Sequence, residues 1–290
     1  MKVLLTGASG QVGRALQSSA PAGAEIRACT RAELDISDGA AVRRAVAAFA
    51  PAVVINAAAY TAVDKAESEP LLAETVNATG PRHLAEAVKD IAGARLIQIS
   101  TDYVFDGLGT ASHRPDDPTH PVSAYGRTKL AGERAVLEVL ADRSVVLRTA
   151  WIYAAEGKNF LLTMLRLMRE RGAVRVVADQ RGSPTAAASV ARALWRIVEL
   201  PGIDGVLHWT DEGTASWCEF AGAIAEEALA AGLLERPATV SPITTADYPT
   251  PARRPMNSVL DLRETIVRLK LRPTPWRDSL RTTLRAVARG

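Results

Sequence analysis

Short apolar segments alternate with longer amphipathic segments through the first half of the chain. Five short segments have the composition of buried strands, and they cover residues 3–5, 25–29, 53–55, 96–99 and 145–147. The segments between them carry apolar residues at helical spacing, and they cover residues 11–19, 38–49, 70–77, 81–89 and 125–140. Strands that alternate with helices of about 10–15 residues predict βαβ units around a parallel sheet.

The pattern changes after about residue 150. Helices are expected at 159–171, 189–200 and 216–233, with short strands at 174–177 and 206–209. The sequence therefore predicts an α/β fold in two parts. A Rossmann-type, doubly wound parallel sheet covers residues 1–150, and a smaller C-terminal α/β substrate-binding lobe, partly interleaved with the first part, covers residues 151–290.

A proline-rich stretch follows the last of these helices. It covers residues 237–255 and is longer than an ordinary loop, and long loops in compact domains are usually functional or disordered. Its Tyr248, Arg253 and Arg254 favour an ordered binding segment.

Composition excludes several classes of protein. A chain of 290 residues suffices for two domains, or for one α/β domain with an added lobe. No apolar run approaches the ~18 residues of a membrane span, and the first residues do not resemble a secretory signal. Cys29 and Cys218 alone cannot form a disulfide framework or a structural zinc site. We expect a soluble, cytoplasmic protein that does not associate with membranes.

The chain is mildly basic, with a net charge of +3 and a pI of about 9.0. Its arginines are scattered, and no basic block is interleaved with aromatic residues, so we expect no nucleic-acid partner. A weak positive field suits an anionic small molecule equally well.

A glycine-rich turn lies between the first strand and the first helix. Its three glycines follow a G-x-x-G-x-x-G spacing, which allows a tight turn and a close approach of the backbone to a pyrophosphate. The helix that follows offers free N–H groups to the phosphates. We expect a nicotinamide dinucleotide to contact Gly7, Ser9, Gly10, Gln11, Val12 and Gly13. The alternative is a tight glycine turn that binds no ligand.

The end of the second strand usually selects between the two nicotinamide cofactors. Residues 29–31 end on Arg31 and carry no carboxylate. A carboxylate there would bind the ribose of NAD, whereas an arginine accommodates the 2′-phosphate of NADP. The sequence favours NADPH and leaves NADH possible, and the alternative for Arg31 is a solvated loop arginine.

Tyr125 and Lys129 form a Y-x-x-x-K pair at the start of a predicted helix. Their i, i+4 spacing places both side chains on one face. Reduction of a ketone needs a proton donor, and a tyrosine with its reference pKa of about 10 is a weak one. A neighbouring ammonium would lower that pKa, and the lysine can also hold the nicotinamide ribose.

The segment Ser100–Thr101–Asp102–Tyr103 comes directly after the strand at 96–99. The hydroxyl of Thr101 can hydrogen-bond a substrate carbonyl, with Ser100 buried beneath it. Alone, Thr101 would be an ordinary strand-end hydroxyl and Tyr103 a core aromatic. Together with the glycine turn and the Tyr–Lys pair, the segment predicts a ketone reductase.

No metal site is expected, because the four histidines are widely separated: His83, His113, His120 and His208.

Several runs of the sequence resemble the dTDP-4-dehydrorhamnose reductases, which belong to the extended short-chain dehydrogenase/reductase superfamily. The glycine spacing is that of the extended enzymes. The runs that carry the closer resemblance are 56–67 (NAAAYTAVDKAE), 100–105 (STDYVF), 125–133 (YGRTKLAGE), 148–153 (RTAWIY), 179–185 (DQRGSPT) and 242–255 (PITTADYPTPARRP). They span nearly the whole chain, including the predicted substrate lobe.

The resemblance implies hydride transfer from NAD(P)H to C4 of dTDP-4-dehydro-β-L-rhamnose, which gives dTDP-L-rhamnose. Tyr125 would be the proton donor, Lys129 its partner, and Thr101 the group that orients the carbonyl. Further cofactor contacts would come from Asp35, Ile36, Ala58, Ala59, Tyr60 and Asn77. Substrate contacts would come from Thr101, Asp102, Tyr103, Trp151 and Arg253.

Alternatives remain open for three of these residues. Asp35 is equally suited to cap a helix, Trp151 to fill a core, and Arg253 to lie in solvent. At the level of function, the alternatives are a reductase of another dTDP-4-keto-6-deoxysugar and a non-catalytic regulatory subunit. Regulatory relatives tend to lose the tyrosine or the lysine, and both are present here.

The resemblance also bears on assembly. Some members of the family form a dimer around a magnesium ion that glutamates hold. Ala15 and Ala188 stand at two of those positions here, so we expect no such metal. We expect a monomer or a weak homodimer.

Overall fold

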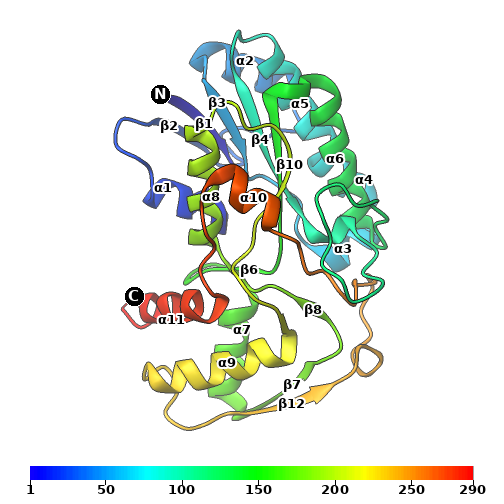
Figure 1. Ribbon diagram of the computed structural model, residues 1–290, viewed down its shortest axis with the longest axis vertical. Helices are drawn as coiled ribbons and strands as arrows, with labels where there is room; N and C mark the ends of the chain where they lie inside the picture. Colours follow the sequence, from blue (N-terminus) through cyan, green and yellow to red (C-terminus); the bar gives the residue numbers. More distant parts are fainter. Residues whose placement is uncertain (290) are drawn as a thin grey trace.

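A six-stranded sheet forms the centre of the computed structural model, which describes residues 1–289 (Figure 1). Its strands are β1 (Lys2–Thr6), β2 (Glu25–Cys29), β3 (Val53–Asn56), β4 (Arg95–Thr101), β5 (Ser144–Thr149) and β10 (Gly205–His208). They lie in the order β10-β5-β4-β3-β1-β2, and every neighbouring pair is parallel. The chain winds outward from β1 in both directions, so the predicted Rossmann-type α/β fold is confirmed.

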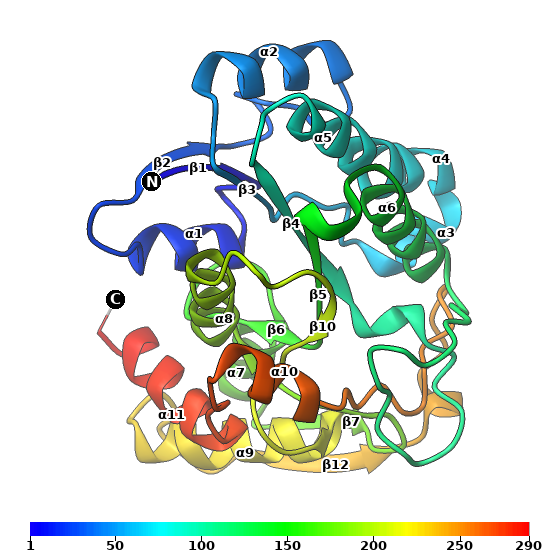
Figure 2. The ribbon, with the colours of Figure 1, turned by 45° about the horizontal axis from the view of Figure 1, so that its top comes forward.

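Helices cover both faces of this sheet (Figure 2). One face carries α1 (Gln11–Ser18) and α8 (Ala187–Glu199), and the other carries α2 (Gly39–Phe49), α5 (Gly80–Lys89) and α6 (Ala124–Leu140). In β1, Val3 and Leu5 pack toward the first face and Leu4 toward the second. Burial on both faces explains why the strands are short continuous apolar runs rather than alternating ones.

A second, smaller core lies at the end of the molecule away from α2 (Figure 1). Around it pack α7 (Phe160–Arg171), α9 (Trp217–Ala230), α11 (Trp276–Val287) and the parallel pair β7 (Ala173–Val177) and β12 (Thr239–Ile243). Tyr153, Leu165 and Phe220 are among its fully or almost fully buried residues. Two short pairs complete this part: β6 (Ile152–Tyr153) with β9 (Thr185–Ala186), and β8 (Arg181–Gly182) with β11 (Ala215–Ser216).

The second half of the chain returns to the central sheet. Strand β10 pairs with β5, helix α8 packs on α1, and α10 (Arg263–Leu269) contacts both α8 and β10. The division at residue 150 remains a prediction, but the segments that complete the large sheet lie beyond that residue.

The proline-rich stretch 237–255 is only partly a loop. Its residues 239–243 form the strand β12, which runs beside β7 and pairs with it through backbone hydrogen bonds on one side of each strand. Pro242 is compatible with this position because β12 is an edge strand. The rest of the stretch includes the 3₁₀ turn η4 (Thr245–Asp247) and then runs back toward α3 (Figure 1).

A continuous helical path replaces the break that the sequence suggests between residues 77 and 81. After α3 (Val63–Ser68), helix α4 (Pro70–Glu74) continues through a π-helical turn, η1 (Thr75–Thr79), into α5. Pro81 does not end the helix because it lies in the first turn of α5, where the missing N–H is tolerated.

Two further 3₁₀ turns are η2 (Asp102–Val104) and η3 (Ala141–Arg143). No helix among residues 1–289 is long and apolar enough to cross a membrane.

Candidate active site

Each of the three glycines in the first βα turn has a different structural role. Gly7 has a φ of +70°, and a Cβ there would lie 2.5 Å from the backbone of Ala57 and Ala58. A Cβ on Gly13 would lie 2.2 Å from the carbonyl oxygen of Gly7. These two glycines are therefore required by packing of the backbone alone. A Cβ on Gly10 would meet only the Gly7 oxygen, at 3.3 Å, so the space beyond Gly10 is open.

Helix α1 presents unpaired N–H groups to this open space. Gly10 is its N-cap and offers no side chain, and the first helical hydrogen bond runs from Arg14 to Gly10 at 2.9 Å. The amides of Gln11, Val12 and Gly13 thus have no acceptor within the described part of the chain. Free amides and the positive end of the helix dipole fit the pyrophosphate of a dinucleotide. Ser9 lies exposed at the edge of the turn.

The end of β2 carries an arginine and two carboxylates. Arg31 is exposed, and its Nε lies 3.3 Å from Asp35 Oδ2. Asp35 Oδ1 accepts hydrogen bonds from the amide and hydroxyl of Ser37, and these bonds hold its pKa below the usual range. The proposed alternative for Asp35 as a helix cap is wrong, because Asp38 caps α2.

Sequence reasoning missed a carboxylate at this end of β2. Glu33 folds back so that its Oε2 accepts from both the amide and the hydroxyl of Thr30, each at 2.8 Å. Residues 29–31 carry no carboxylate, but the folded chain brings the Glu33 carboxylate to the end of β2. Ile36 is buried and packs over Gly80, where a Cβ would lie 2.6 Å from its side chain.

Asn77 joins the segment after β3 to the catalytic helix. Its Oδ1 accepts from the Tyr60 amide at 2.8 Å, and its Nδ2 donates to the Tyr60 carbonyl and to Thr128 Oγ1. Helix α6 approaches closely because residue 132 is glycine, where a Cβ would lie 2.0 Å from the Asn77 carbonyl oxygen. Asn77 thereby fixes the backbone of Tyr60, while the Ala58 amide donates to Asn56 Oδ1; Ala58, Ala59 and Tyr60 are all partly exposed.

Tyr125 and Lys129 lie on the inner face of α6, next to the end of β4. The Nζ of Lys129 donates to the carbonyl oxygen of Ile99 at 2.6 Å, and burial lowers the pKa of this lysine to about 8. Tyr125 is partly exposed at the residue level, while its phenol is surrounded by protein that raises its pKa to about 12. Tyr103 stands edge-on to it, with ring centroids 5.7 Å apart.

The structure corrects one expectation about this pair. The sequence suggests that the ammonium lowers the pKa of the tyrosine. Here the groups that act on Tyr125 are, after burial, the Thr101 hydroxyl, which lowers its pKa, and Asp102, which raises it. The physical reason is that Lys129 points to the backbone of β4 rather than to the phenol.

Thr101 ends strand β4, and Asp102 follows it as the first residue of η2. Thr101 Oγ1 donates to Asp102 Oδ1 at 2.9 Å and accepts from the Tyr103 amide at 3.2 Å. Asp102 is 2% exposed, and its Oδ2 has no hydrogen-bond partner in the described residues. Burial raises the pKa of this carboxyl to about 6. The hydroxyl of Ser100, one residue earlier, is also buried without a partner.

Trp151 follows β5 at the junction between the two cores. It has a φ of +48°, which is rare for a residue with a large side chain and marks a strained backbone. Its ring stacks on Trp217 with centroids 3.5 Å apart and covers Gly182, where a Cβ would lie 2.4 Å away. The ring therefore packs against protein and is only half-buried.

Arg253 is exposed, and its neighbour Arg254 makes the contacts near the site. Arg254 Nη2 donates to Asp64 Oδ2 at 2.8 Å, and the Asp64 carboxylate also accepts from the Ala252 amide. The Arg254 charge acts on Tyr103 by lowering its pKa, although burial of Tyr103 raises it more. Sequence reasoning did not select Arg254 or Asp64 as site residues, although both lie within runs that carry the family resemblance.

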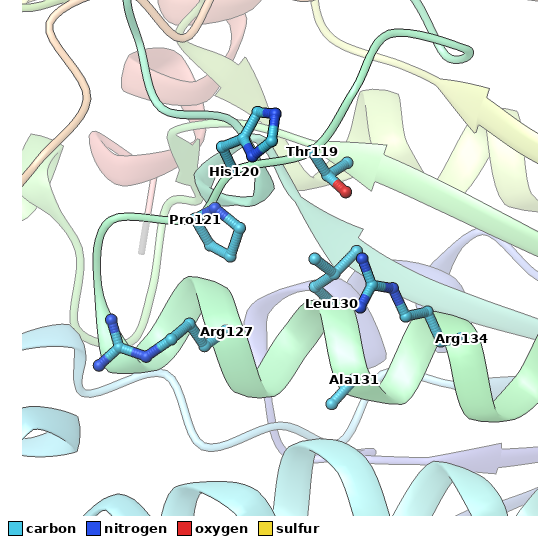
Figure 3. Close-up of a pocket in the computed structure, with 7 residues that line it drawn as sticks. All are labelled: Thr119, His120, Pro121, Arg127, Leu130, Ala131 and Arg134. Atoms are coloured by element: carbon cyan, nitrogen blue, oxygen red, sulfur yellow. The ribbon is translucent and has the colours of Figure 1, made fainter.

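A separate groove of about 430 Å³ lies on the outer side of α6 (Figure 3). It is lined by Thr119, His120, Pro121, Arg127, Leu130, Ala131 and Arg134. Arg127, Ala131 and Arg134 are exposed, whereas Lys129 is buried on the inner side of the same helix. None of the predicted site residues lines this groove. Residues 1–289 contain no group of three or more histidines, cysteines or acids placed to hold a metal ion.

The glycine turn opens toward the free amides of α1. Tyr125 and Lys129 lie on α6 beside the end of β4. Together these features define a nicotinamide-dependent oxidoreductase of the extended short-chain class. The family model described as the RmlD substrate binding domain matches residues 1–289. The dTDP-4-dehydrorhamnose reductase of Streptomyces griseus is 50% identical over 89% of this chain and 84% of its own length. The chain therefore belongs to the dTDP-4-dehydrorhamnose reductase family.

Two further comparisons refine this placement. The crystal structure of the Bacillus anthracis dTDP-4-dehydrorhamnose reductase in complex with NADP is 34% identical, with a TM-score of 0.92 over 97% of this chain and 98% of that one. A Streptomyces antibioticus protein named probable dTDP-4,6-dihydroxy-2-methyloxan-3-one 4-ketoreductase is 42% identical over 90% of this chain and 86% of its own.

Proposed function

We propose that this chain reduces the C4 ketone of dTDP-4-dehydro-β-L-rhamnose to the hydroxyl of dTDP-L-rhamnose with NADPH. The observation that carries the proposal is the convergence of Tyr125, Thr101 and Lys129 at the ends of the strands beside the open glycine turn. The substrate is inferred from the relatives that carry this name and match the chain over most of their own length.

The glycine turn and the amides of α1 would hold the pyrophosphate. Arg31 would contact the 2′-phosphate of NADPH, because its guanidinium is exposed and only weakly paired with Asp35. Ile36, Ala58, Ala59, Tyr60 and Asn77 would surround the rest of the cofactor. When bound, NADPH supplies the hydride for the ketone carbon.

The remaining chemistry is a proton transfer from the protein. With a pKa of about 12, Tyr125 keeps its proton at neutral pH and can donate it to the developing alkoxide. The Thr101 hydroxyl, which donates to Asp102 in this structure, would turn its proton to the ketone oxygen when the substrate binds and so orient the ketone toward Tyr125. The Lys129 ammonium, which lies beside the end of β4 and donates to the Ile99 carbonyl, would hold the nicotinamide ribose.

The sugar and the diphosphate would contact residues from both parts of the chain. Asp102, Tyr103 and Trp151 would face the sugar, and Arg253 would face the diphosphate. Arg254, whose charge acts on Tyr103, adds a second positive charge to this side of the site.

One assay tests the proposal. We would supply dTDP-4-dehydrorhamnose with NADPH and, separately, with NADH, and determine the C4 configuration of the product. Turnover that is faster with NADPH and yields dTDP-L-rhamnose supports the proposal, and no turnover with either cofactor contradicts it.

Replacement of the proton donor gives the mechanistic prediction. We expect Tyr125→Phe to lower kcat by at least about 100-fold, the usual contribution of a general acid, while NADPH still quenches protein fluorescence. Tyr153→Phe, which removes the hydroxyl of a tyrosine in the second core, is the matched control. Wild-type turnover by Tyr125→Phe would show that another group donates the proton.

A second candidate function has one observation in its favour. The Streptomyces antibioticus relative carries the name of a reductase for a different dTDP-linked ketosugar. The catalytic residues would be the same, and the sugar pocket around Tyr103 and Trp151 would differ in its choice of substrate. The same assay with a panel of dTDP-4-keto-6-deoxysugars distinguishes the two by their kcat/KM ratios.

The proposal extends to assembly and location. We propose a cytoplasmic location. We also propose a monomer or weak homodimer, since the side chains of Ala15 and Ala188 offer no oxygen ligand for a bridging metal ion. Sedimentation with and without Mg²⁺ tests the assembly.

A further inference from the structure

An ion pair lies in the interior between helix α6 and strand β5. Arg148 donates from Nη2 to Glu133 Oε2 at 2.8 Å and from Nε to Glu133 Oε1 at 3.0 Å. The two side chains are 5% and 2% exposed. Both charges are therefore removed from water and satisfy one another through a two-point contact.

A contribution to stability does not by itself explain this pair. Removing two charges from water is unfavourable, and apolar residues of similar volume often stabilise a protein as well or better. We therefore looked for a neighbouring group whose charge depends on one of the two partners of the pair.

The neighbour is Lys129. Glu133 lies one helical turn after Lys129, so both side chains are on the inner face of α6. Lys129 is 4% exposed, and the Ile99 carbonyl is its one hydrogen-bond acceptor in the described residues. Burial lowers the pKa of this lysine, and the Glu133 carboxylate raises it. No other charged group has a resolved effect on Lys129.

We propose that Glu133 and Arg148 are positioning residues for the reduction: the Glu133 carboxylate is the counter-charge that keeps the buried Lys129 ammonium charged, and Arg148 holds that carboxylate in place.

Arg148 is suited to this role because several elements fix its guanidinium. Its Nη1 donates to the Pro115 carbonyl at 3.2 Å and lies 3.4 Å from His208 Nε2. The guanidinium also lies over the ring of Phe105, 5.2 Å from its centroid. Fixed from these sides, the guanidinium holds the Glu133 carboxylate through its two-point contact.

Three titratable groups near the pair, Tyr125, Asp102 and His208, do not change charge in the range in which Lys129 titrates. On α6, the pKa of Tyr125 is raised to about 12, and at the end of β4 that of Asp102 is about 6. On β10, burial and the Arg148 charge lower the pKa of His208 to about 3, so this imidazole stays neutral. His113 and Asp261 face His208 from the segments packed beside it. Among Tyr125, Asp102, His208 and Lys129, it is Lys129 that loses a proton between about pH 7 and 10.

The charge of Lys129 can be measured directly. The chain has six lysines, and we would follow their ¹³Cε signals in the apoenzyme through a pH titration, with Lys129→Met to assign the signal. A lysine in water titrates near about 10.4, so a buried lysine stands apart.

The two partners should act in opposite directions. Glu133→Gln removes the counter-charge, so we expect Lys129 to titrate lower by about one pH unit or more. Arg148→Met leaves the carboxylate without its arginine, so Lys129 should titrate higher. Arg148→Lys, which keeps the charge, should restore a titration near that of the wild type. A merely structural pair would lower the melting temperature of each variant and leave the Lys129 titration where it is.

A double variant covers the case in which a single variant does not fold. Glu133→Gln with Arg148→Met leaves no unpaired charge in the interior. We expect Lys129 to titrate below the wild-type value in it, because the nearer charge, the carboxylate, is gone. An unshifted titration in the folded variants would overturn the proposal.

The catalytic consequence rests on the proposed function and is read separately. The alkaline limb of the kcat–pH profile should move with the Lys129 titration, down in Glu133→Gln and up in Arg148→Met. If the titration moves and the limb does not, the pair sets the charge of Lys129 but the role of Lys129 in the proposed reaction is wrong.

Discussion

Three ionisable side chains around Thr101 respond to the same burial in different ways. Loss of water disfavours the charged form of each group, so the pKa of Asp102 and of Tyr125 rises and that of Lys129 falls. At neutral pH Tyr125 keeps its proton, whereas Asp102 and Lys129 have pKa values within about one or two units of the working range. A proton donor held ready is what a ketone reductase needs.

The buried carboxyl of Asp102 makes the stability of the folded protein depend on pH. Its folded-state pKa of about 6 lies above its ordinary value, so the stability that the protonated carboxyl contributes is complete below about pH 4 and is lost as the pH rises through about 6. Asp102→Asn keeps the acceptor for the Thr101 hydroxyl and removes this loss. We expect the variant to be more stable than the wild type by about 2 kcal/mol at pH 7.5 and nearly equal to it at pH 4.

Urea unfolding at the two pH values measures this difference. Asp90→Asn, which replaces an exposed carboxylate, is the control. A difference in the free energy of unfolding that is the same at both pH values would contradict the assignment of the raised pKa to Asp102.

At the scale of elements, the turn from β1 into α1 combines two requirements. Gly7 and Gly13 allow the turn, the helix and the segment after β3 to approach one another at backbone distance. Gly10 has an extended conformation that any residue can adopt, and it borders open space. The element is therefore built by two glycines, and the third leaves room for a phosphate.

Matched alanine substitutions separate these requirements. Gly13→Ala places a methyl group against the Gly7 carbonyl, and we expect a loss of about 3 kcal/mol in the free energy of unfolding. Gly10→Ala should change that free energy by less than about 1 kcal/mol and weaken NADPH binding by about 10-fold or more, because the methyl group fills the open space. Thermal melts and fluorescence titrations measure both effects. Undiminished NADPH affinity in Gly10→Ala would mean that the phosphates bind elsewhere.

At the scale of the whole molecule, contacts between distant segments close the site. The Asp64–Arg254 pair ties the segment after β3 to the end of the proline-rich stretch. On the other side, Gln11 accepts a hydrogen bond from Asn159, the N-cap of α7. The glycine turn is thus linked to the second core, and the tyrosine side is covered by residues 250–255.

The Asp64–Arg254 pair can be tested without loss of the fold. It is partly exposed, so Arg254→Met should lower the free energy of unfolding by no more than about 1 kcal/mol. We expect hydrogen exchange of residues 250–256 to become faster by several-fold and the KM for the dTDP-sugar to rise, since the segment is no longer anchored. Arg166→Met, which breaks an exposed pair on α7, is the control. Unchanged exchange in residues 250–256 would show that the ion pair does not anchor the segment.

Much of the catalytic half was predictable from local patterns. The glycine spacing, the Y-x-x-x-K spacing and the apolar runs of the parallel strands depend on residues within one or two turns of each other, and backbone geometry fixes their consequences. For the same reason the strand at 25–29 is found with those bounds as β2. The cap of α2 was not predicted correctly: the sequence offered Asp35 for this role and placed Asp38 inside the helix, whereas the helix starts at Gly39 and Asp38 caps it.

The sequence by itself determined the parallel sheet, the dinucleotide turn and the family of the chain. Tertiary structure decided that β10 completes the sheet, that β12 pairs with β7, and that Lys129 points to Ile99 instead of Tyr125. It also decided the partners of Arg148 and Arg254, which come from other elements of the fold. The physical reason is that the partner of a buried charge depends on which segments pack together in space, and no local spacing in the chain encodes that choice.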